Sequence, residues 1–438
     1  MCLTGPVTTA VPLGYPIHEH TLENGLRVVV SPDHAVPFVA VNLWYDGGSR
    51  DEQPGRTGLA HLFEHVMFQG SENVASGEHF NTLQASGATG NATTWFDRTN
   101  YFEAVPTGVL DLALWLEADR MANLLPALTQ ENLDTQREVV KEEKRQRYDN
   151  APYGDTIDHV LALAFPPEHP YGHTVIGSMA DLDAASLDDT HAFFTRWYSP
   201  ANAVLTLVGD VTAEDGLAKA RALFGHLPTR GVPARARVSP LPPHAGVPRR
   251  VATAPVPADM LYLQWRTPAR GSRLADAVDI ALTVLGGSET SRLYRRLVRE
   301  DGTCSGAGSS AIPLAWGNSL SLAYTRALDG ADLAAIEQAL CDEVERLCAD
   351  GPTDAELQRA HIQFEREWLG ECARLESRAD LFSAHATMFG DPGRVNRRIV
   401  EYTAVTAAEV RDAARAWLRP DQRAVLEYRR GPMGPDQW

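Results

Sequence analysis

The sequence predicts an α+β fold made of two homologous domains, each a mixed β-sheet with helices packed on it. Segments with strand and helix patterns are interspersed without the regular alternation of a parallel α/β sheet. A proline-rich stretch interrupts the chain near its middle, and similar segments recur on either side of it. At 438 residues the chain is long enough for two or three domains with cores of their own.

The proline-rich stretch is the predicted linker. Six prolines fall between positions 228 and 248, with small and basic residues among them, a composition that favours an extended chain over a packed element. We therefore predict an N-terminal domain at residues 1–228, a linker at 229–248 and a C-terminal domain at 249–438.

Two pairs of segments indicate an internal duplication. The stretch 58–71 matches 275–288 at an offset of 217 residues, and Trp197-Tyr-Ser-Pro200 matches Trp417-Leu-Arg-Pro420 at an offset of 220. Each member of the second pair follows a helical pattern and precedes an apolar, strand-like run. The shared order and similar spacing predict that the two halves have the same fold.

The first elements of the N-terminal half follow from their hydrophobic periods. Residues 26–31 and 38–45 are short apolar runs rich in valine, which predict strands. Residues 58–70 carry apolar side chains at helical spacing. Residues 88–96 and 101–105 alternate apolar and polar side chains and predict two paired strands joined by a short turn.

The remaining elements of this half complete one sheet with its helices. Residues 110–123, 131–149 and 186–197 show helical patterns, and the apolar run 203–208 predicts a further strand. We expect these helices to cover one face of the sheet.

Composition excludes several classes of protein. Apolar residues make up 44% and charged residues 22%, as in ordinary globular proteins. The net charge of −17 argues against binding to nucleic acid or to an anionic membrane surface. No apolar stretch is long enough for a transmembrane helix. Three lysines against 37 arginines indicate a GC-rich coding sequence, typical of a bacterial source.

The cysteines and the N-terminus favour the cytoplasm. Five cysteines are few for this length and odd in number, which suits a reducing compartment and buried structural thiols. The N-terminal residues lack a basic segment followed by an apolar one, so we expect no signal peptide.

The most informative motif is His61-Leu-Phe-Glu64-His65, which lies inside the predicted helix 58–70. Histidines at i and i+4 project from one helical face, and Glu64 points to nearly the same side. Two imidazoles bind zinc, while a neighbouring carboxylate acts as general base on the metal-bound water. The order of residues is the inverse of the commoner zinc-protease motif and is termed the inverzincin pattern.

A catalytic zinc requires a third protein ligand. The charged helix 131–149 offers Glu142 and Glu143. We expect Val139 and Val140 to mark its buried side, and Glu143 follows them at +4 and +3. Helical phase therefore favours Glu143 only slightly over Glu142.

These motifs resemble the pitrilysin and mitochondrial-processing-peptidase family over most of the chain. His61-x-x-Glu64-His65 is followed by Arg137-Glu-Val-Val-x-Glu-Glu143 at the family's distance. Further similar stretches are Asn91-Ala-x-Thr94 with Asp97-x-Thr-x-Tyr101, His169-Pro-Tyr-Gly172, Tyr198-x-Pro-x-Asn202 before Gly209-Asp210, and Gly286-Gly287 before Ser291-Arg-Leu293.

The resemblance implies a fold and a chemistry. It implies a half clamshell of two similar domains, zinc bound by His61, His65 and Glu143, and Glu64 as the base. Two half clamshells enclose a peptide chamber in that family, and this chain has the length of one, so we expect a dimer.

The second half departs from this pattern. At an offset of 217 residues, His61, Glu64 and His65 correspond to Val278, Ala281 and Leu282, which do not bind zinc.

The family also carries an Arg and a Tyr, seven residues apart, that hold the substrate backbone. The matching positions here are Val298 and Ser305, while Arg299 is one residue out of register. We therefore expect a related partner subunit to supply that pair.

Weaker candidates surround the motif. Family substrates pair with the strand at 88–96, so Asn91, Ala92 and Thr94 are the expected substrate contacts. Asp119 or Glu117 is a candidate to hydrogen-bond a metal-bound imidazole. For His169 and His173, interrupted by proline and glycine, we expect a loop role and not a second metal site.

The sequence thus predicts a zinc-dependent endopeptidase that hydrolyses short or unfolded peptides in a closed chamber. The alternative is a non-catalytic structural subunit of a related two-subunit assembly. The motif alone also permits a zinc hydrolase that acts on something other than peptides.

Overall fold

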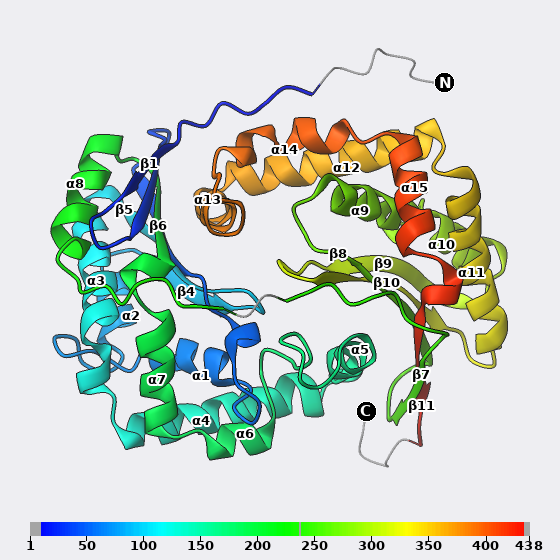
Figure 1. The fold of residues 1–438 in the computed structure, drawn as a ribbon, viewed down its shortest axis with the longest axis horizontal. Coiled ribbons are helices and arrows are strands. Elements are labelled where there is room, and N and C mark those ends of the chain that lie inside the picture. The colour runs from blue at the N-terminus through cyan, green and yellow to red at the C-terminus, as the bar shows by residue number, and fades with distance from the viewer. Residues whose placement is uncertain (1–9, 236–237, 433–438) are drawn as a thin grey trace.

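A computed structural model describes residues 10–235 and 238–432. The chain forms two β-sheets, one in each half, with helices packed around both (Figure 1). The six-stranded sheet of the N-terminal half has the order β1-β2-β6-β3-β5-β4. Its strands are β1 His18–Thr21, β2 Arg27–Pro32, β3 Phe38–Tyr45, β4 Thr89–Thr94, β5 Thr99–Pro106 and β6 Ala203–Gly209.

The helices of the N-terminal half lie between and after these strands. They are α1 Leu59–Val66, α2 Glu78–Ala85, α3 Leu110–Ala127, α4 Gln130–Lys144, α5 Thr156–Ala164, α6 Met179–Ala184, α7 Leu187–Trp197 and α8 Ala213–Phe224. A π-helical turn, Arg145–Asp149, continues α4 toward α5. Each strand and helix predicted in this half has an observed counterpart, with small differences at the ends.

The C-terminal half repeats the sheet with one strand fewer. Its order is β7-β11-β8-β10-β9, with β7 parallel to β11 and the other neighbours antiparallel. The strands are β7 Arg249–Ala254, β8 Met260–Pro268, β9 Cys304–Ile312, β10 Asn318–Ala327 and β11 Ala424–Arg430.

The helices of this half lie between its strands, as in the N-terminal half. They are α9 Arg273–Gly286, α10 Arg292–Tyr294, α11 Leu333–Asp350, α12 Asp354–Ala373, α13 Leu375–Phe389, α14 Arg394–Thr403 and α15 Ala407–Trp417. A π-helical turn, Arg295–Glu300, continues α10.

The two sheets match strand for strand. Strands β2, β6, β3, β5 and β4 correspond in order and direction to β7, β11, β8, β10 and β9, and in the part of the chain that the structure describes β1 has no counterpart. This agreement supports the internal duplication. The first segment match aligns α1 with α9, and the second aligns the ends of α7 and α15.

The expectation that the helices cover one face of their own sheet was wrong for two of them. Helix α13 packs on β3 and β6 of the N-terminal sheet, and α5 packs on β8 and β11 of the C-terminal sheet. Figure 1 shows each helix beside the sheet of the opposite half. Each half therefore gives one helix to the other.

Apolar burial explains this exchange. On the N-terminal sheet, Trp44, Val204 and Val208 form a buried cluster with Ala379 and Phe382 of α13. Because β6 is buried along its whole length, it needs a cover on both faces.

The same packing holds α5 on the second sheet. Val160 and Leu161 of α5 are buried against Leu322 and Tyr428. The side chain of Gln264 also donates a hydrogen bond to the carbonyl of Val160, at 3.0 Å.

A polar contact also joins the two halves. Asp97, in the β4–β5 turn, accepts hydrogen bonds from Tyr171, at 2.6 Å, and from the backbone N–H of Ala315, at 2.9 Å. Arg50 forms an ion pair with the same carboxylate, at 2.5 Å.

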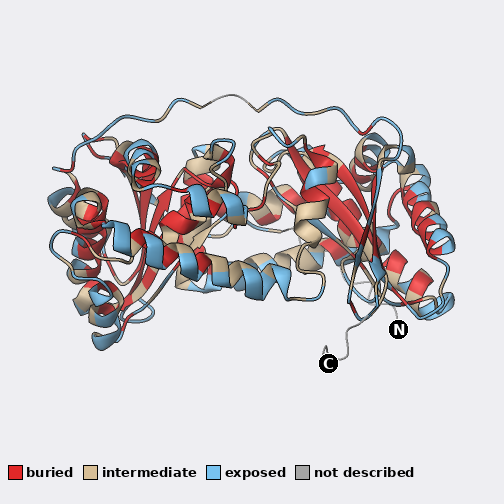
Figure 2. Cartoon of the chain, turned by 90° about the horizontal axis from the view of Figure 1, so that it is seen from below, coloured by how far each residue is buried: buried red, intermediate tan, exposed pale blue. Residues whose placement is uncertain are grey.

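The linker has no helix or strand within its described residues, 229–235 and 238–248. Figure 2 shows it passing along the outside from one half to the other. Within the described part of the chain, no helix combines the length and the hydropathy needed to span a membrane.

The helix exchange predicts that the halves do not fold separately. Residues 1–228 expressed alone would expose the apolar face under α13, and residues 249–438 alone would expose the face under α5. We expect both fragments to aggregate alone and to form a soluble complex when co-expressed, as measured by gel filtration.

The control leaves both exchanged helices in place. A protease site inserted after the exposed Val232, then cut in the purified protein, should leave the melting temperature nearly unchanged. Two fragments that each fold alone would contradict the argument.

Candidate metal centre

Helix α1 carries all three residues of the His-x-x-Glu-His motif. Its apolar side, including Leu62, Phe63 and Val66, is buried in the core of the N-terminal half. This packing leaves His61, Glu64 and His65 on the opposite, partly exposed side. Burial of one helical face thus aims the three polar side chains in one direction.

The start of α1 is fixed by residues outside the motif. Gly58 adopts φ of +89°, and a Cβ there would come within 2.6 Å of the carbonyl oxygen of Ile176. The carboxylate of Glu52 accepts hydrogen bonds from the backbone N–H groups of Gly58, at 2.9 Å, and Ala60, at 2.6 Å. Glu52 therefore satisfies N–H groups that the first helical turn leaves free.

His173 completes this anchor. Its Nε2 lies 2.9 Å from a carboxylate oxygen of Glu52 and 3.0 Å from the carbonyl of Ser49. Burial opposes protonation of His173, but the hydrogen bond and charge of Glu52 outweigh it and raise the imidazole pKa. His173 lies in a loop, as the sequence predicted, and its contact with Glu52 was not foreseen.

Helix α4 places Glu143 beside α1. Val140 is buried and Glu143 lies three residues later on the same side, whereas Val139 is 44% exposed, so the expectation that both valines face the core was wrong for Val139. Glu142 points to solvent and contacts Arg145 and Gln146. The structure brings Glu143, and not Glu142, to the histidines.

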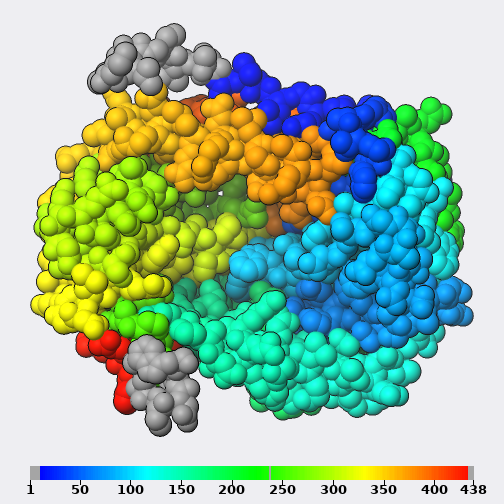
Figure 3. All heavy atoms as spheres, turned by 180° about the vertical axis from the view of Figure 1, so that it is seen from behind, coloured from blue at the N-terminus to red at the C-terminus, as the bar shows by residue number. Residues whose placement is uncertain are grey.

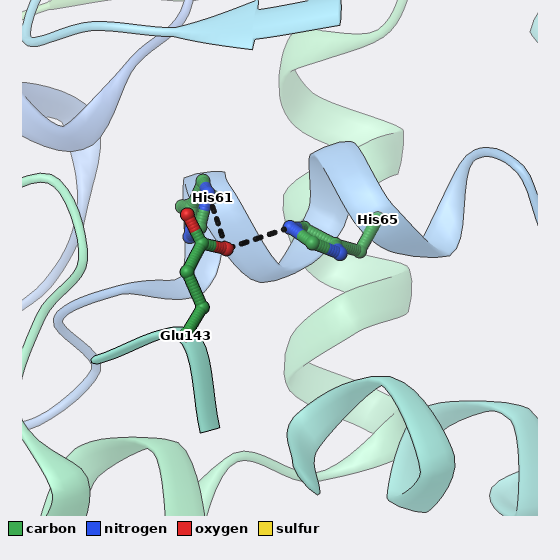
Figure 4. Close-up of side chains that lie close together, drawn as sticks. All are labelled: His61, His65 and Glu143. Carbon is green, nitrogen blue, oxygen red and sulfur yellow. Dashed lines mark ion pairs between the residues drawn. The ribbon is translucent and has the colours of Figure 1, made fainter. Parts of the chain in front are cut away.

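The three side chains converge on one point (Figure 4). Oε2 of Glu143 lies 3.7 Å from Nε2 of His61 and 3.4 Å from Nε2 of His65. Tetrahedral zinc bonds of about 2.1 Å would separate neighbouring ligand atoms by about 3.4 Å. One ligand atom from each residue lies within 4.8 Å of the other two, so the donor set fits a zinc ion in type and spacing.

The electrostatics of the cluster favour the same chemistry. Burial, together with the neighbouring His65, lowers the pKa of His61 to about 4, which keeps this imidazole neutral and able to donate a lone pair. The hydrogen bond with His65 lowers the pKa of Glu143. Arg147, one turn along the chain, pairs with the other oxygen of Glu143 at 2.6 Å.

Glu64 turns toward the edge of the sheet. Its Oε2 accepts a hydrogen bond from the hydroxyl of Thr94, at 2.5 Å. Burial raises the pKa of Glu64, against the effect of this hydrogen bond. The expected contact residue Thr94 is thus engaged with Glu64.

Strand β4 is the last strand of its sheet and pairs only with β5 within the described residues, so its other edge is unpaired. Asn91 is exposed there, while the side chain of Ala92 is buried in the core. A contact through Ala92 would therefore use its backbone.

Neither candidate for an imidazole partner reaches the metal ligands. Asp119 accepts hydrogen bonds from Ser71 and Asn73, after α1, and from Asn123. Glu117 pairs with Arg120. The suggestion that Asp119 or Glu117 orients His61 or His65 was wrong, because both carboxylates are used elsewhere.

A second group of possible ligands lies in the core. His79, Glu103 and Glu117 approach one another, but the guanidinium of Arg120 also pairs with both glutamates. Since Arg120 already balances charge there, the group is better explained as a buried polar network than as a metal site.

The positions of α9 that correspond to the motif carry apolar side chains. Val278, Ala281 and Leu282 of α9 are buried in the C-terminal core. Val298 packs partly against the same core, and Ser305 is exposed at the start of β9. Arg299 lies over the ring of Tyr294, at 5.6 Å.

Comparisons with known proteins agree with the geometry. Residues 27–176 match the family described as "Insulinase (Peptidase family M16)", and residues 184–364 match "Peptidase M16 inactive domain". The chain is 30% identical over 388 residues to "Zinc protease PqqE" of Helicobacter pylori, covering 86% of this chain and 83% of that protein. It is 24% identical to "Uncharacterized zinc protease YmxG" of Bacillus subtilis, covering 94% and 98%.

Solved structures have the same architecture. A protease from Helicobacter pylori superposes with a TM-score of 0.88 at 26% identity, covering 96% of this chain and all of the other. Pitrilysin superposes with a TM-score of 0.79 at 16% identity, covering 99% of this chain and 47% of pitrilysin. The two matched regions, the zinc-protease relatives and the fold lead to one assignment: the chain belongs to peptidase family M16.

Proposed function

We propose that the protein is a zinc-dependent endopeptidase that cleaves short or unfolded peptides. The observation that carries this proposal is the convergence of His61, His65 and Glu143 at zinc-ligand spacing, with Glu64 on the same face of α1. Relatives named zinc proteases support the peptidase assignment.

His61 and His65 would hold one zinc ion per chain through Nε2, and Glu143 through Oε2. Bound there, zinc supplies Lewis acidity to a water and to a peptide carbonyl at its open position. Arg147 holds the second oxygen of Glu143, so that only one oxygen points at the histidines.

Glu64 would act as the general base. Thr94 holds Oε2 of Glu64, which leaves Oε1 to accept a proton from the attacking water and later deliver it to the leaving amine. A carboxyl pKa raised by burial suits this role, because such a group retains the proton until it is needed.

The peptide would add as a strand to the unpaired edge of β4. Pairing through the main chain gives affinity with little demand on sequence. Asn91 would contribute its exposed side chain, Ala92 its backbone, and Thr94 its position next to Glu64.

A second chain would complete the chamber. This chain spans about half of pitrilysin, and neither Val298 nor Ser305 provides an Arg/Tyr pair. A homodimer or a pairing with a related subunit would close the space around the peptide and exclude folded proteins.

The alternative role, a non-catalytic structural subunit, is less well supported. A chain with only a scaffold function would not need three ligands at zinc spacing together with an aligned carboxylate. A reducing compartment such as the cytoplasm remains our proposal for location, since Cys304, Cys341, Cys348 and Cys372 form no disulfide.

The two adjacent glutamates of α4 provide a matched test of the metal site. We expect Glu143→Gln to weaken zinc binding by more than about 100-fold, since losing even an outer partner of a ligand costs roughly 10- to 100-fold. Glu142→Gln, one residue away and exposed, should keep wild-type affinity. Zinc content after dialysis against a competing chelator measures both, and equal loss in the two variants would exclude Glu143 as the third ligand.

A second test separates chemistry from metal binding. Glu64→Gln should retain one zinc per chain and lower kcat by about a hundred- to ten-thousandfold, the usual contribution of a general base. An unstructured peptide library analysed by mass spectrometry gives the rate. Wild-type turnover in this variant would remove Glu64 from the mechanism.

The chamber proposal predicts a dependence on assembly. Purified chain diluted below its dimer dissociation constant, or separated from a co-purified partner, should lose peptidase activity in proportion to the loss of the larger species in light scattering. Full activity in a strictly monomeric sample would contradict the need for a partner.

A further inference from the structure

A cavity of about 190 Å³ lies in the C-terminal half, between α9 and the helices α12, α13 and α14. The end of β8 and the start of β10 close its remaining side. Viewed from behind, the molecule is hollowed near α13, where the two halves meet (Figure 3). None of the residues assigned above to zinc or catalysis lines this cavity.

Most charged groups in the cavity wall already have partners. Arg398 forms two hydrogen bonds to Asp276, both at 2.9 Å. Arg394 donates to Glu401, at 2.7 Å. Asp279 accepts a hydrogen bond from Tyr402, at 2.6 Å.

Arg270 is different. Its guanidinium makes no hydrogen bond or ion pair with any residue in the described part of the chain, although it lines the cavity. Burial lowers its pKa, and the nearest charges that oppose this, Asp97 and Asp380, lie beyond ion-pair distance. The Arg270 side chain is half-buried and has no direct partner, so its charge is incompletely compensated and the wall can accept an anion.

Four aromatic side chains form one part of the wall. Phe364 stacks on Tyr402 with ring centres 3.7 Å apart, and Trp368 and Phe389 line the same space. His385 donates from Nδ1 to the carbonyl of Leu381, at 2.8 Å, and burial lowers its pKa to about 3, so it adds no second cation. The cavity thus combines one guanidinium without a direct partner, several charged groups that are already paired, and an aromatic patch.

We propose that this cavity binds the C-terminal residue of a peptide. The fork of Arg270 would hold the terminal carboxylate through two N–H groups, and the aromatic wall would cover the terminal side chain. This inference rests on the proposed peptidase function and names its substrate class as peptides with a free C-terminus.

The position of the cavity relative to the candidate metal centre fits this role. The side chain of Asn100, on β5, donates a hydrogen bond to Asp380 of α13, at 2.9 Å, so a helix that lines the cavity contacts the strand paired with β4. The cavity therefore lies on the side of the C-terminal half that faces β4.

Binding is tested without catalysis, in the Glu64→Gln protein. The probes are N-acetylphenylalanine and N-acetylphenylalanine amide, which differ only in the carboxylate. By calorimetry we expect the acid to bind about tenfold or more tightly than the amide, as a charge-assisted pair allows. Adding Arg270→Gln should abolish that difference, whereas Arg394→Gln, which removes an already paired arginine from the same wall, should preserve it.

Three results would overturn the assignment. They are equal binding of acid and amide, a preference that survives Arg270→Gln, and inorganic phosphate binding as tightly as the acid. The last would mean a simple anion site without a use for the aromatic wall.

A stability measurement separates ligand binding from a structural role. In the unliganded protein, Arg270→Met should raise the melting temperature slightly, because it removes an unpaired, half-buried charge. A large decrease would indicate that Arg270 supports the fold and would count against the proposal.

Kinetics then connect the cavity to the peptidase. For one peptide with a free or an amidated C-terminus, amidation should raise KM about tenfold with little change in kcat, and Arg270→Gln should remove the effect. If the acid binds as expected but no peptide is cleaved by the wild-type chain, the proposed function fails and the cavity assignment stands. If the wild-type chain cleaves the free and the amidated peptide with the same KM, the cavity assignment fails and the proposed function stands.

Discussion

The exchange of α5 and α13 between the two sheets is the interaction on which the rest of the structure depends. Each sheet has apolar side chains on both faces, and helices of its own half cover only one of them. Trp44 and Val204 on one sheet, and Leu322 and Tyr428 on the other, would face water without the exchanged helix. The hydrophobic effect therefore stabilises the two halves as one unit.

This constraint extends to the candidate metal centre. The helix that supplies Glu143 continues through a π-helical turn toward α5, which is packed on the opposite half. Helix α1 is fixed at its start by Glu52 and His173, which both belong to the N-terminal half. The distance between Glu143 and the two histidines thus depends on packing within one half and on packing across both.

Much of the site followed from the sequence because it lies on one helix. The spacing of His61, Glu64 and His65 determines that they share a face in any α-helix. The choice between Glu142 and Glu143 was harder. The two side chains lie about 100° apart around the helix, and the buried side was judged partly from Val139, which proved exposed. The roles of Asp119, Glu117 and His173 depend on contacts between distant segments, which helical phase does not encode. The exchanged helices were missed for the same reason, because an apolar face does not specify which sheet it will cover.

The missing counterpart of β1 has a consequence for the C-terminal sheet. In the N-terminal sheet β1 pairs with β2, but among the described residues no strand pairs with the outer edge of β7, the strand equivalent to β2. Such edges invite pairing with strands of other molecules. Here β7 begins with two exposed arginines, of which Arg249 pairs with Glu337 and Glu427. These charged side chains at the start of β7 disfavour pairing of its edge with a strand of another molecule, which is the protection that β1 gives to β2 in the other sheet.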